Sequence, residues 1–167
     1  KNRGFVGYGI TFAFIFGVMF SYISASPFFI QNQLGFSVTT YSLIFALNAI
    51  GMMVCGTLNN RLMDHYSPAQ ILRAAIAVIG VAIIVLAFGS KFALTSWVML
   101  PALFFAIAPM SMVMGNATAL ATGLVRERAG AGSAVLGCAQ FMLAGIVSPL
   151  VGIGSNHAFS MAVCMII

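Results

Sequence analysis

Charged residues are scarce in this chain of 167 residues. Asp, Glu, Lys and Arg together make up 5% of it, whereas hydrophobic residues make up 62%. About a quarter of the residues of a typical soluble domain are charged, so this composition excludes an ordinary soluble domain. Repeated long apolar runs instead predict an all-α membrane protein that crosses the bilayer several times.

Groups that carry catalysis are equally rare. The two carboxylates, Asp64 and Glu127, fall in predicted loops beside arginines, where solvated ion pairs are the simpler interpretation. His65 and His157 are predicted on opposite sides of the membrane, so they cannot share a site. The sequence has no Ser-His-Asp arrangement, phosphate-binding loop or metal-ligand spacing. It therefore predicts a protein that is not an enzyme and that binds no metal or cofactor.

Two further absences concern partners and processing. The net charge of +5 would suggest nucleic acid as a partner for a soluble chain, but here the basic residues fall in loops and are interpreted as charges that set membrane orientation. The three cysteines lie within apolar runs and have no metal or disulfide pattern, so they are interpreted as packing residues. The apolar run after Arg3 is too long for the core of a signal peptide.

Apolar runs of membrane-spanning length are what the chain has instead. Pro27 predicts a bend near the end of the first run, and Pro101 and Pro109 predict a kinked or broken fourth run. The second run is expected to end in a polar turn at Asn59 to Arg61. The chain is expected to be a piece of a longer protein, because it starts on a basic segment and stops within an apolar run. The predicted spans cover residues 4–30, 39–58, 68–88, 94–124 and 129–153, with a truncated sixth at 158–167.

The basic residues divide unevenly between the two sides of the predicted membrane. With Lys1 in the cytoplasm, six of the seven basic residues lie inside and only Lys91 lies outside, which fits the positive-inside rule. The spans also form two sets of three, and each set pairs a Pro-interrupted helix with a helix that carries a mid-membrane amide, Asn48 or Gln140. Because three is an odd number, the sets are inverted relative to each other, as in the 3+3 repeats of a transporter half.

The second span carries a polar and aromatic stripe. The residues that share one face, at spacings of three and four, are Tyr41, Phe45, Asn48, Met52, Cys55 and Asn59. Lipid cannot satisfy such a face, so it should contact protein or a water-filled cavity. Tyr22 lies on a similar face of the first span, for which packing and a cavity wall remain equal alternatives. The substrate-cavity candidates are Tyr22, Tyr41, Phe45, Asn48, Met52, Met112, Asn116 and Gln140.

Stripes of small residues are expected to be helix contacts, because small side chains let helix backbones approach each other. They run along the fourth span at Gly115, Ala119 and Gly123. Along the fifth span they lie at Ala129, Ser133 and Gly137, and again at Ala144, Ser148 and Gly152.

Five segments carry a resemblance to a known family. Gly56-Thr57-Leu58-Asn59-Asn60-Arg61 resembles the G-x-L-x-D-R loop motif of the major facilitator superfamily, with Asn60 in place of the Asp. The order and spacing of the four other segments resemble the C-terminal half of the Bcr/CflA (bicyclomycin/chloramphenicol resistance) drug:proton antiporters. These segments are Tyr22–Phe28, Phe45–Gly51, Gly115–Ala121 and Ala129–Ala134.

This resemblance implies a twelve-helix exporter of the bacterial inner membrane, with the present spans as its helices seven to twelve. It also implies a gating role for Asn60 and Arg61, an N-terminal six-helix half as partner, small apolar or amphipathic drugs as substrates, and the proton gradient as the energy source. No ionisable residue falls at mid-depth in the predicted spans, so a coupling carboxylate is expected elsewhere in the protein. The competing interpretation is a polytopic membrane scaffold or assembly subunit in which every stripe is a packing face.

Overall fold

The computed structural model describes residues 3–92 and 95–151, apart from the side chains of residues 33, 91 and 147–151. Helices and short connections make up these two segments, and five of the helical spans are long and apolar enough to cross a membrane. The all-α prediction is therefore confirmed for the described chain. The sixth predicted span, at residues 158–167, lies outside the described residues.

The first span changes its hydrogen-bond pattern where the sequence predicts a bend. The α-helix α1 runs from Arg3 to Pro27 and continues directly as the π-helix η1, Phe28–Gln33. Proline lacks the N–H that would continue the α-helical pattern, and wider π-turns are a known response to such interruptions. Phe29 and Ile30 of η1 are almost fully buried, so this irregular segment is part of the core.

The next two helices begin at serine caps. Ser37 caps α2 (Val38–Leu62), since its side chain accepts a hydrogen bond from the Thr40 amide at 3.2 Å. Ser67 and Gln70 form a capping box at the start of α3 (Pro68–Lys91), with Pro68 in the first turn as expected.

One boundary differs from the prediction. Residues Asn59 to Arg61 are helical, so the expected polar turn is wrong and α2 ends only after Leu62. The gating candidates Asn60 and Arg61 therefore lie in the last turns of α2, with exposed side chains, and the connecting turn is 63–67. The polar residues mark the end of the apolar run. A helix can nevertheless continue past the hydrocarbon core into the membrane interface, where water can bond to its polar side chains.

The fourth span is broken, as the prolines predict. Helix α4 covers Ser96–Ile107 and α5 covers Met110–Gly123, with Pro109 at the break, while Pro101 stays within α4. A short 3-10 turn, η2 (Arg126–Arg128), leads into α6 (Ala129–Val151).

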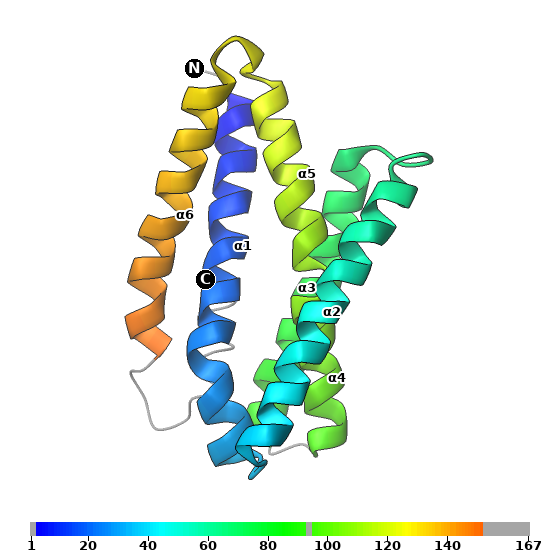
Figure 1. Cartoon of the computed structure of the whole chain (residues 1–167), viewed down its shortest axis with the longest axis vertical. Coiled ribbons are helices and arrows are strands. Elements are labelled where there is room, and N and C mark those ends of the chain that lie inside the picture. Colours follow the sequence, from blue (N-terminus) through cyan, green and yellow to red (C-terminus); the bar gives the residue numbers. More distant parts are fainter. Residues whose placement is uncertain (1–2, 93–94, 152–167) are drawn as a thin grey trace.

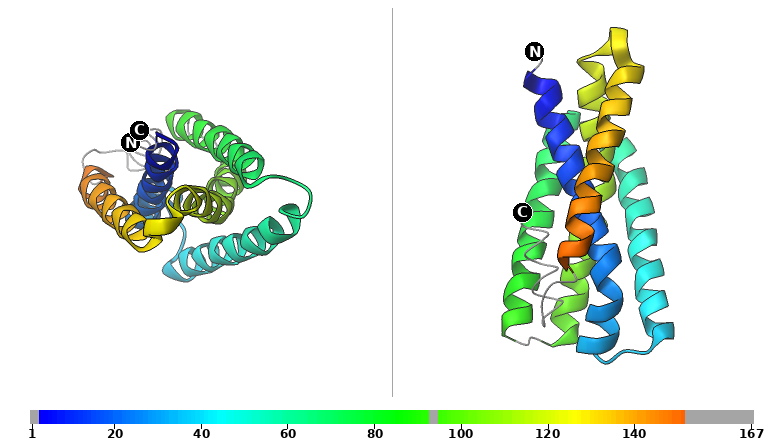
Figure 2. Two further views of the ribbon diagram at one scale, coloured as in Figure 1. Left: turned by 90° about the horizontal axis from the view of Figure 1, so that it is seen from above. Right: turned by 90° about the vertical axis from the view of Figure 1, so that its left-hand side faces the viewer.

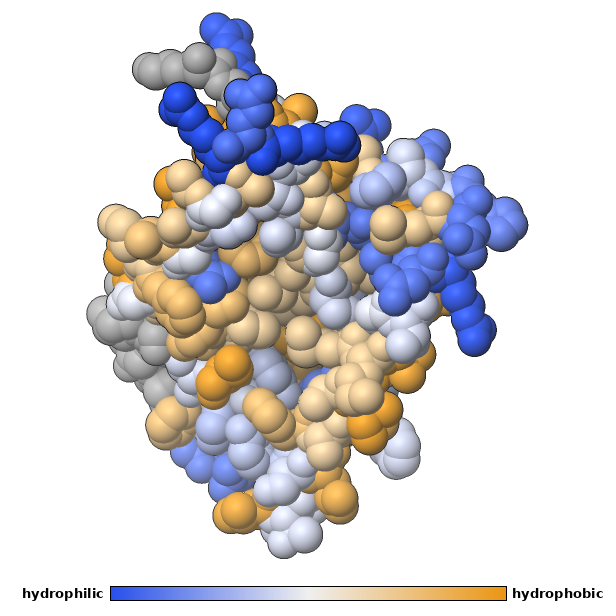
Figure 3. All heavy atoms as spheres, turned by 45° about the horizontal axis from the view of Figure 1, so that its top comes forward, coloured by the Kyte–Doolittle hydropathy of each residue, from blue (hydrophilic) through white to orange (hydrophobic). Residues whose placement is uncertain are grey.

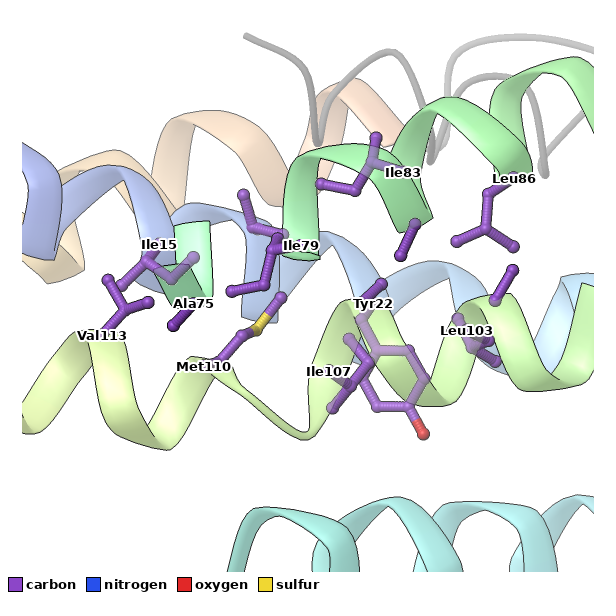
Figure 4. Close-up of a cluster of buried hydrophobic side chains, with 14 of the residues drawn as sticks. Ile15, Tyr22, Ala75, Ile79, Ile83, Leu86, Leu103, Ile107, Met110 and Val113 are labelled. Atoms are coloured by element: carbon purple, nitrogen blue, oxygen red, sulfur yellow. The ribbon is translucent and has the colours of Figure 1, made fainter. Parts of the chain in front are cut away.

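The helices surround a core built mainly from α1, α3, α4 and α5. Helix α1 packs against α5 and α6, and α3 packs against α4 and α5 (Figures 1 and 2). Figure 4 shows Ile15, Ile79, Leu103 and Met110 from these four helices meeting in the core. Helix α2 contacts α5 and α4 but is the least buried of the five spans, so most of its apolar surface is uncovered.

Most of the small-residue stripes do not lie where the described helices meet. The residues of the α5 stripe and Ala129 and Ser133 on α6 are exposed, and a Cβ added at Gly115, Gly123 or Gly137 would meet nothing within 4 Å. Ala144 on α6 is buried, whereas the Ser148 side chain and Gly152 lie outside what the structure describes.

The tightest approach at a described glycine is at Gly51, where an added Cβ would be 2.5 Å from Phe104 Cε2. Within the described chain, the expectation of helix contacts is therefore wrong for the exposed stripe residues Gly115, Ala119, Gly123, Ala129 and Ser133.

The charged side chains that the structure describes gather at one end of the molecule, whereas Lys91 ends α3 at the other. The start of α1, the turn from α2 to α3 and the turn from α5 to α6 lie at the charged end (Figure 1). Figure 3 shows hydrophilic residues concentrated there and hydrophobic residues over the flank below.

Candidate functional site

The candidate site is built along α2, on the side that faces α1 and α5. Four positions on this side make polar contacts across to a neighbouring helix, and we call them the α2 polar row. Successive positions lie seven, four and seven residues apart, which keeps them on one face of the helix. The row consists of the Tyr41 hydroxyl, the Asn48 amide, the Met52 carbonyl and the Asn59 amide.

The middle of the row joins α2 to α1. The Asn48 Nδ2 donates a hydrogen bond of 3.0 Å to the Tyr22 hydroxyl, and each of these residues is only 3% exposed. The Tyr22 ring stacks on Phe45, with ring centroids 5.6 Å apart and planes 10° apart. In Figure 4 the Tyr22 hydroxyl points away from the core toward α2. The helix-to-helix bond explains why both polar groups can be buried in an apolar region.

Tyr41 extends this group toward the end of the molecule that lies opposite the charged turns. Its hydroxyl lies 3.5 Å from the Ser26 Oγ, and its ring lies 6.0 Å from that of Phe45. Tyr41 is half-buried and Phe45 is 37% exposed, so part of each ring is accessible. The structure thus brings together Tyr22, Tyr41, Phe45 and Asn48, which we call the aromatic cluster.

The far end of the row joins α2 to α5. The Asn116 Nδ2 donates to the Asn59 Oδ1 at 2.6 Å and to the Met112 carbonyl at 2.9 Å. Asn116 is 1% exposed and Asn59 is 8% exposed, so this amide pair is buried near the charged end. Helical spacing puts Asn59 on the α2 stripe, but the polar turn expected at Asn59 to Arg61 concealed its place in the helix and its contact with Asn116.

Ser111 was also missed. Its hydroxyl lies just after the Pro109 break and donates to the Met52 carbonyl on α2 at 2.9 Å. A hydroxyl next to a proline break was the available signal, because broken helices leave backbone groups that side chains satisfy.

The remaining candidates are spread more widely. Met112 is buried beside Asn116, and Met52 is half-buried against the core. Gln140 is half-buried on α6, with α1 and α5 between it and α2 (Figures 1 and 2). The predicted residues therefore form two groups along α2 and one separate position.

The chemistry available at this site is hydrogen bonding and aromatic contact. Within residues 3–92 and 95–151, no cluster of His, Cys, Asp and Glu could hold a metal ion. In the same residues every fully buried side-chain nitrogen and oxygen has a hydrogen-bond partner. Phenols and neutral amides can orient a ligand, but they are not acids or bases suited to proton transfer near neutral pH.

Comparison with known proteins gives a family match over most of the chain. Residues 1–149 match the model of the Major Facilitator Superfamily. The whole chain is 30% identical to a Bacillus subtilis protein named uncharacterized MFS-type transporter YdgK, of which it covers 42%. It is 24% identical to a Haemophilus influenzae protein named bicyclomycin resistance protein homolog, of which it covers 43%. The chain thus spans less than half the length of these relatives, and no solved structure matches it significantly.

Proposed function

The chain belongs to the major facilitator superfamily, and we propose that it forms the C-terminal half of a multidrug exporter of the bacterial inner membrane. The complete protein would exchange small apolar or amphipathic drugs for protons by alternating access. An N-terminal six-helix half would be its partner, and the charged end would face the cytoplasm. The similarity to a bicyclomycin resistance protein homolog supports the drug class.

The observation that carries this proposal is the aromatic cluster. Phe45 and Tyr41 present accessible ring surface, and behind them Tyr22 and Asn48 are held in place by their mutual hydrogen bond. Aromatic walls with a few fixed polar groups are typical of sites for small organic ligands. Such walls tolerate ligands of varied shape, because ring contacts are less directional than an array of hydrogen bonds.

Proton coupling needs a group outside this cluster. Asp64 follows the last turn of α2, and Glu127 lies in η2, so both carboxylates lie at the charged end rather than at mid-depth. We therefore assign proton exchange to a carboxylate of the N-terminal half, and drug contact and helix movement to the present chain. The gating role of Asn60 and Arg61 remains part of this proposal, exerted from the end of α2.

A scaffold or assembly subunit is the second candidate. The observation in its favour is that Tyr22, Asn48, Asn59 and Asn116 are paired with one another, as packing residues would be. A scaffold would need these pairs for stability alone, so mutations in the accessible rings would change no transport property.

Drug resistance in a bacterial host that lacks its own exporters tests the proposal. The full-length protein should raise the inhibitory concentrations of chloramphenicol and ethidium, and a protonophore should restore ethidium accumulation in the same cells. Phe45→Ala should change the ratio of resistance between the two drugs at unchanged membrane abundance, because the ring contacts each drug differently.

Phe88→Ala is the matched control, since this ring is also exposed but lies on α3. It should leave both resistances unchanged. Unaltered sensitivity of cells in which the wild-type protein is abundant in the membrane would reject drug export and favour the scaffold.

A further inference from the structure

A pocket of about 870 Å³ lies between α2 and α4, apart from the aromatic rings described above. Its walls come from α2 and α4 and from the connections before them, so it lies at the end opposite the charged turns (Figure 1). The volume falls within the roughly 300–1,000 Å³ range of sites for small organic ligands.

The pocket is apolar along its walls and polar at three places, of which Thr40 at the start of α2 is one. Thr95, Ser96 and Trp97 lie at the start of α4, where Trp97 is 87% exposed, as expected for an aromatic residue at a membrane interface. Phe104 and Leu47 line the walls, and the amide of Asn48 provides the polar group of the interior.

Asn48 has hydrogen-bonding capacity left for a ligand. An amide can donate two hydrogen bonds and accept two. Within the described residues, the side chain of Asn48 makes one hydrogen bond, through Nδ2 to Tyr22. The residue as a whole is only 3% exposed, and it still lines the pocket. Because every fully buried side-chain oxygen of the described residues is paired, the Asn48 oxygen is open to the pocket. A ligand with a hydrogen-bond donor can pair with it there, and a purely hydrocarbon occupant cannot.

A neighbouring pocket provides the contrast. A second hollow of about 490 Å³ lies between α3 and α4 and shares Pro101 and Phe105 with the first. All of its lining residues are apolar, among them Val78, Val81 and Ala102. A lipid acyl chain suits that second pocket, whereas the pocket with Asn48 suits a molecule that also carries a hydrogen-bonding group.

We propose that the pocket between α2 and α4 binds a small amphipathic molecule, whose apolar part lies against Leu47 and Phe104 and whose polar group bonds to Asn48. This inference rests on the proposed drug transport and adds a ligand site on the side of Asn48 away from Tyr22. Asn48 then serves both sides of α2, with one polar atom for the helix contact and the other for the ligand.

Photolabelling with competition tests the site in the full-length protein. The protein is placed in lipid nanodiscs and labelled with 3-trifluoromethyl-3-phenyldiazirine, an apolar probe, with and without chloramphenicol. Chloramphenicol should abolish most of the labelling at Leu47 and Phe104. Labelling should persist at Leu43, an exposed residue of α2 outside the pocket, and at Val81 in the second pocket.

A variant that fills the pocket gives a second measurement. Leu47→Trp should raise the chloramphenicol concentration for half protection of Phe104 about tenfold, because the larger indole occupies volume that the ligand needs; a tenfold change corresponds to about 1.4 kcal/mol of binding free energy. Leu43→Trp, one turn earlier on the same helix, should leave it unchanged. Both side chains are exposed, so neither substitution disturbs the core.

Three results would overturn the site. Labelling at Leu47 and Phe104 could be insensitive to chloramphenicol, or both Trp variants could behave alike. Labelling there could also be absent in nanodiscs and appear only after lipid removal, which would identify a lipid site. Resistance measured on the same protein separates the two proposals: export without protection rejects the pocket alone, and protection without export rejects the transport function alone.

Discussion

At the scale of single residues, the buried amide pair of Asn59 and Asn116 is a direct polar link between α2 and α5. Removing one amide leaves the other buried without its hydrogen-bond partner, which costs about 1–3 kcal/mol of stability. We expect Asn116→Ala and Asn59→Ala each to lower the thermal midpoint of the full-length protein in detergent. In a double-mutant cycle the two should couple by about 0.6–2 kcal/mol, the range found for polar pairs between membrane helices.

Asn60→Ala is the control for that pair, because Asn60 is adjacent in sequence but exposed. It should leave the midpoint unchanged. Additive effects of Asn59→Ala and Asn116→Ala would show that the 2.6 Å contact contributes nothing to stability.

The Asn48 and Tyr22 pair allows a sharper separation of roles. Tyr22→Phe removes the acceptor of the bond, whereas Asn48→Leu removes the bond and also the amide that lines the pocket. We expect similar losses of thermal stability, and a changed pattern of drug resistance only for Asn48→Leu. Identical resistance patterns for both variants at equal abundance would reduce Asn48 to a packing role.

The residues of the aromatic cluster could be predicted, but their pairing could not. Helical periodicity places Tyr41, Phe45 and Asn48 on one face, and the cost of exposing them to lipid requires that they meet protein or water. Periodicity within one helix does not say which helix lies opposite. The partners Tyr22 and Ser111 therefore required the structure.

At the scale of helices, Gly51 sets the distance between α2 and α4. A Cβ there would lie 2.5 Å from Phe104 Cε2 and 3.0 Å from Ala108 Cβ. Gly51→Ala should therefore displace the Phe104 ring and crowd Ala108, and it should lower the free energy of unfolding by about 1–3 kcal/mol. Folded yield in detergent, measured by size-exclusion chromatography, should fall accordingly.

Gly56→Ala on the same helix is the matched control. Nothing lies within 4 Å of its added Cβ, so the substitution should be neutral or stabilise the helix by up to about 1 kcal/mol. Equal yields of the two variants would contradict the close approach at Gly51.

The contact face of α5 shows where sequence reasoning fails for packing. Ala117 and Ala121 are fully buried, whereas Gly115 and Ala119 are exposed. Positions two residues apart point about 200° apart on a helix, so the stripes lie on opposite faces. Both consist of small residues and both would permit close packing. Only the positions of the other helices decide between them.

At the scale of the whole molecule, the helical fold and the family could both be predicted. Apolar length and rare charge require membrane helices, and the quoted motifs identify the superfamily that the match over residues 1–149 confirms. The extension of α2 through Arg61 could not be predicted, because polar residues mark the edge of the hydrocarbon and not the end of a helix. The inverted arrangement of two sets of three helices stays a prediction.

The distribution of charge gives the last prediction, the orientation in the membrane. Arg61, Arg126 and Arg128 lie at one end of the described chain, and the positive-inside rule assigns that end to the cytoplasm. In intact cells a membrane-impermeant maleimide should label the full-length protein with Phe92→Cys, because exposed Phe92 lies at the other end. Asp64→Cys should react only after the cells are opened, since Asp64 lies in the turn at the charged end. Labelling of Asp64→Cys but not Phe92→Cys in intact cells would reverse the assignment. The gating candidates Asn60 and Arg61 would then lie on the outer side of the membrane.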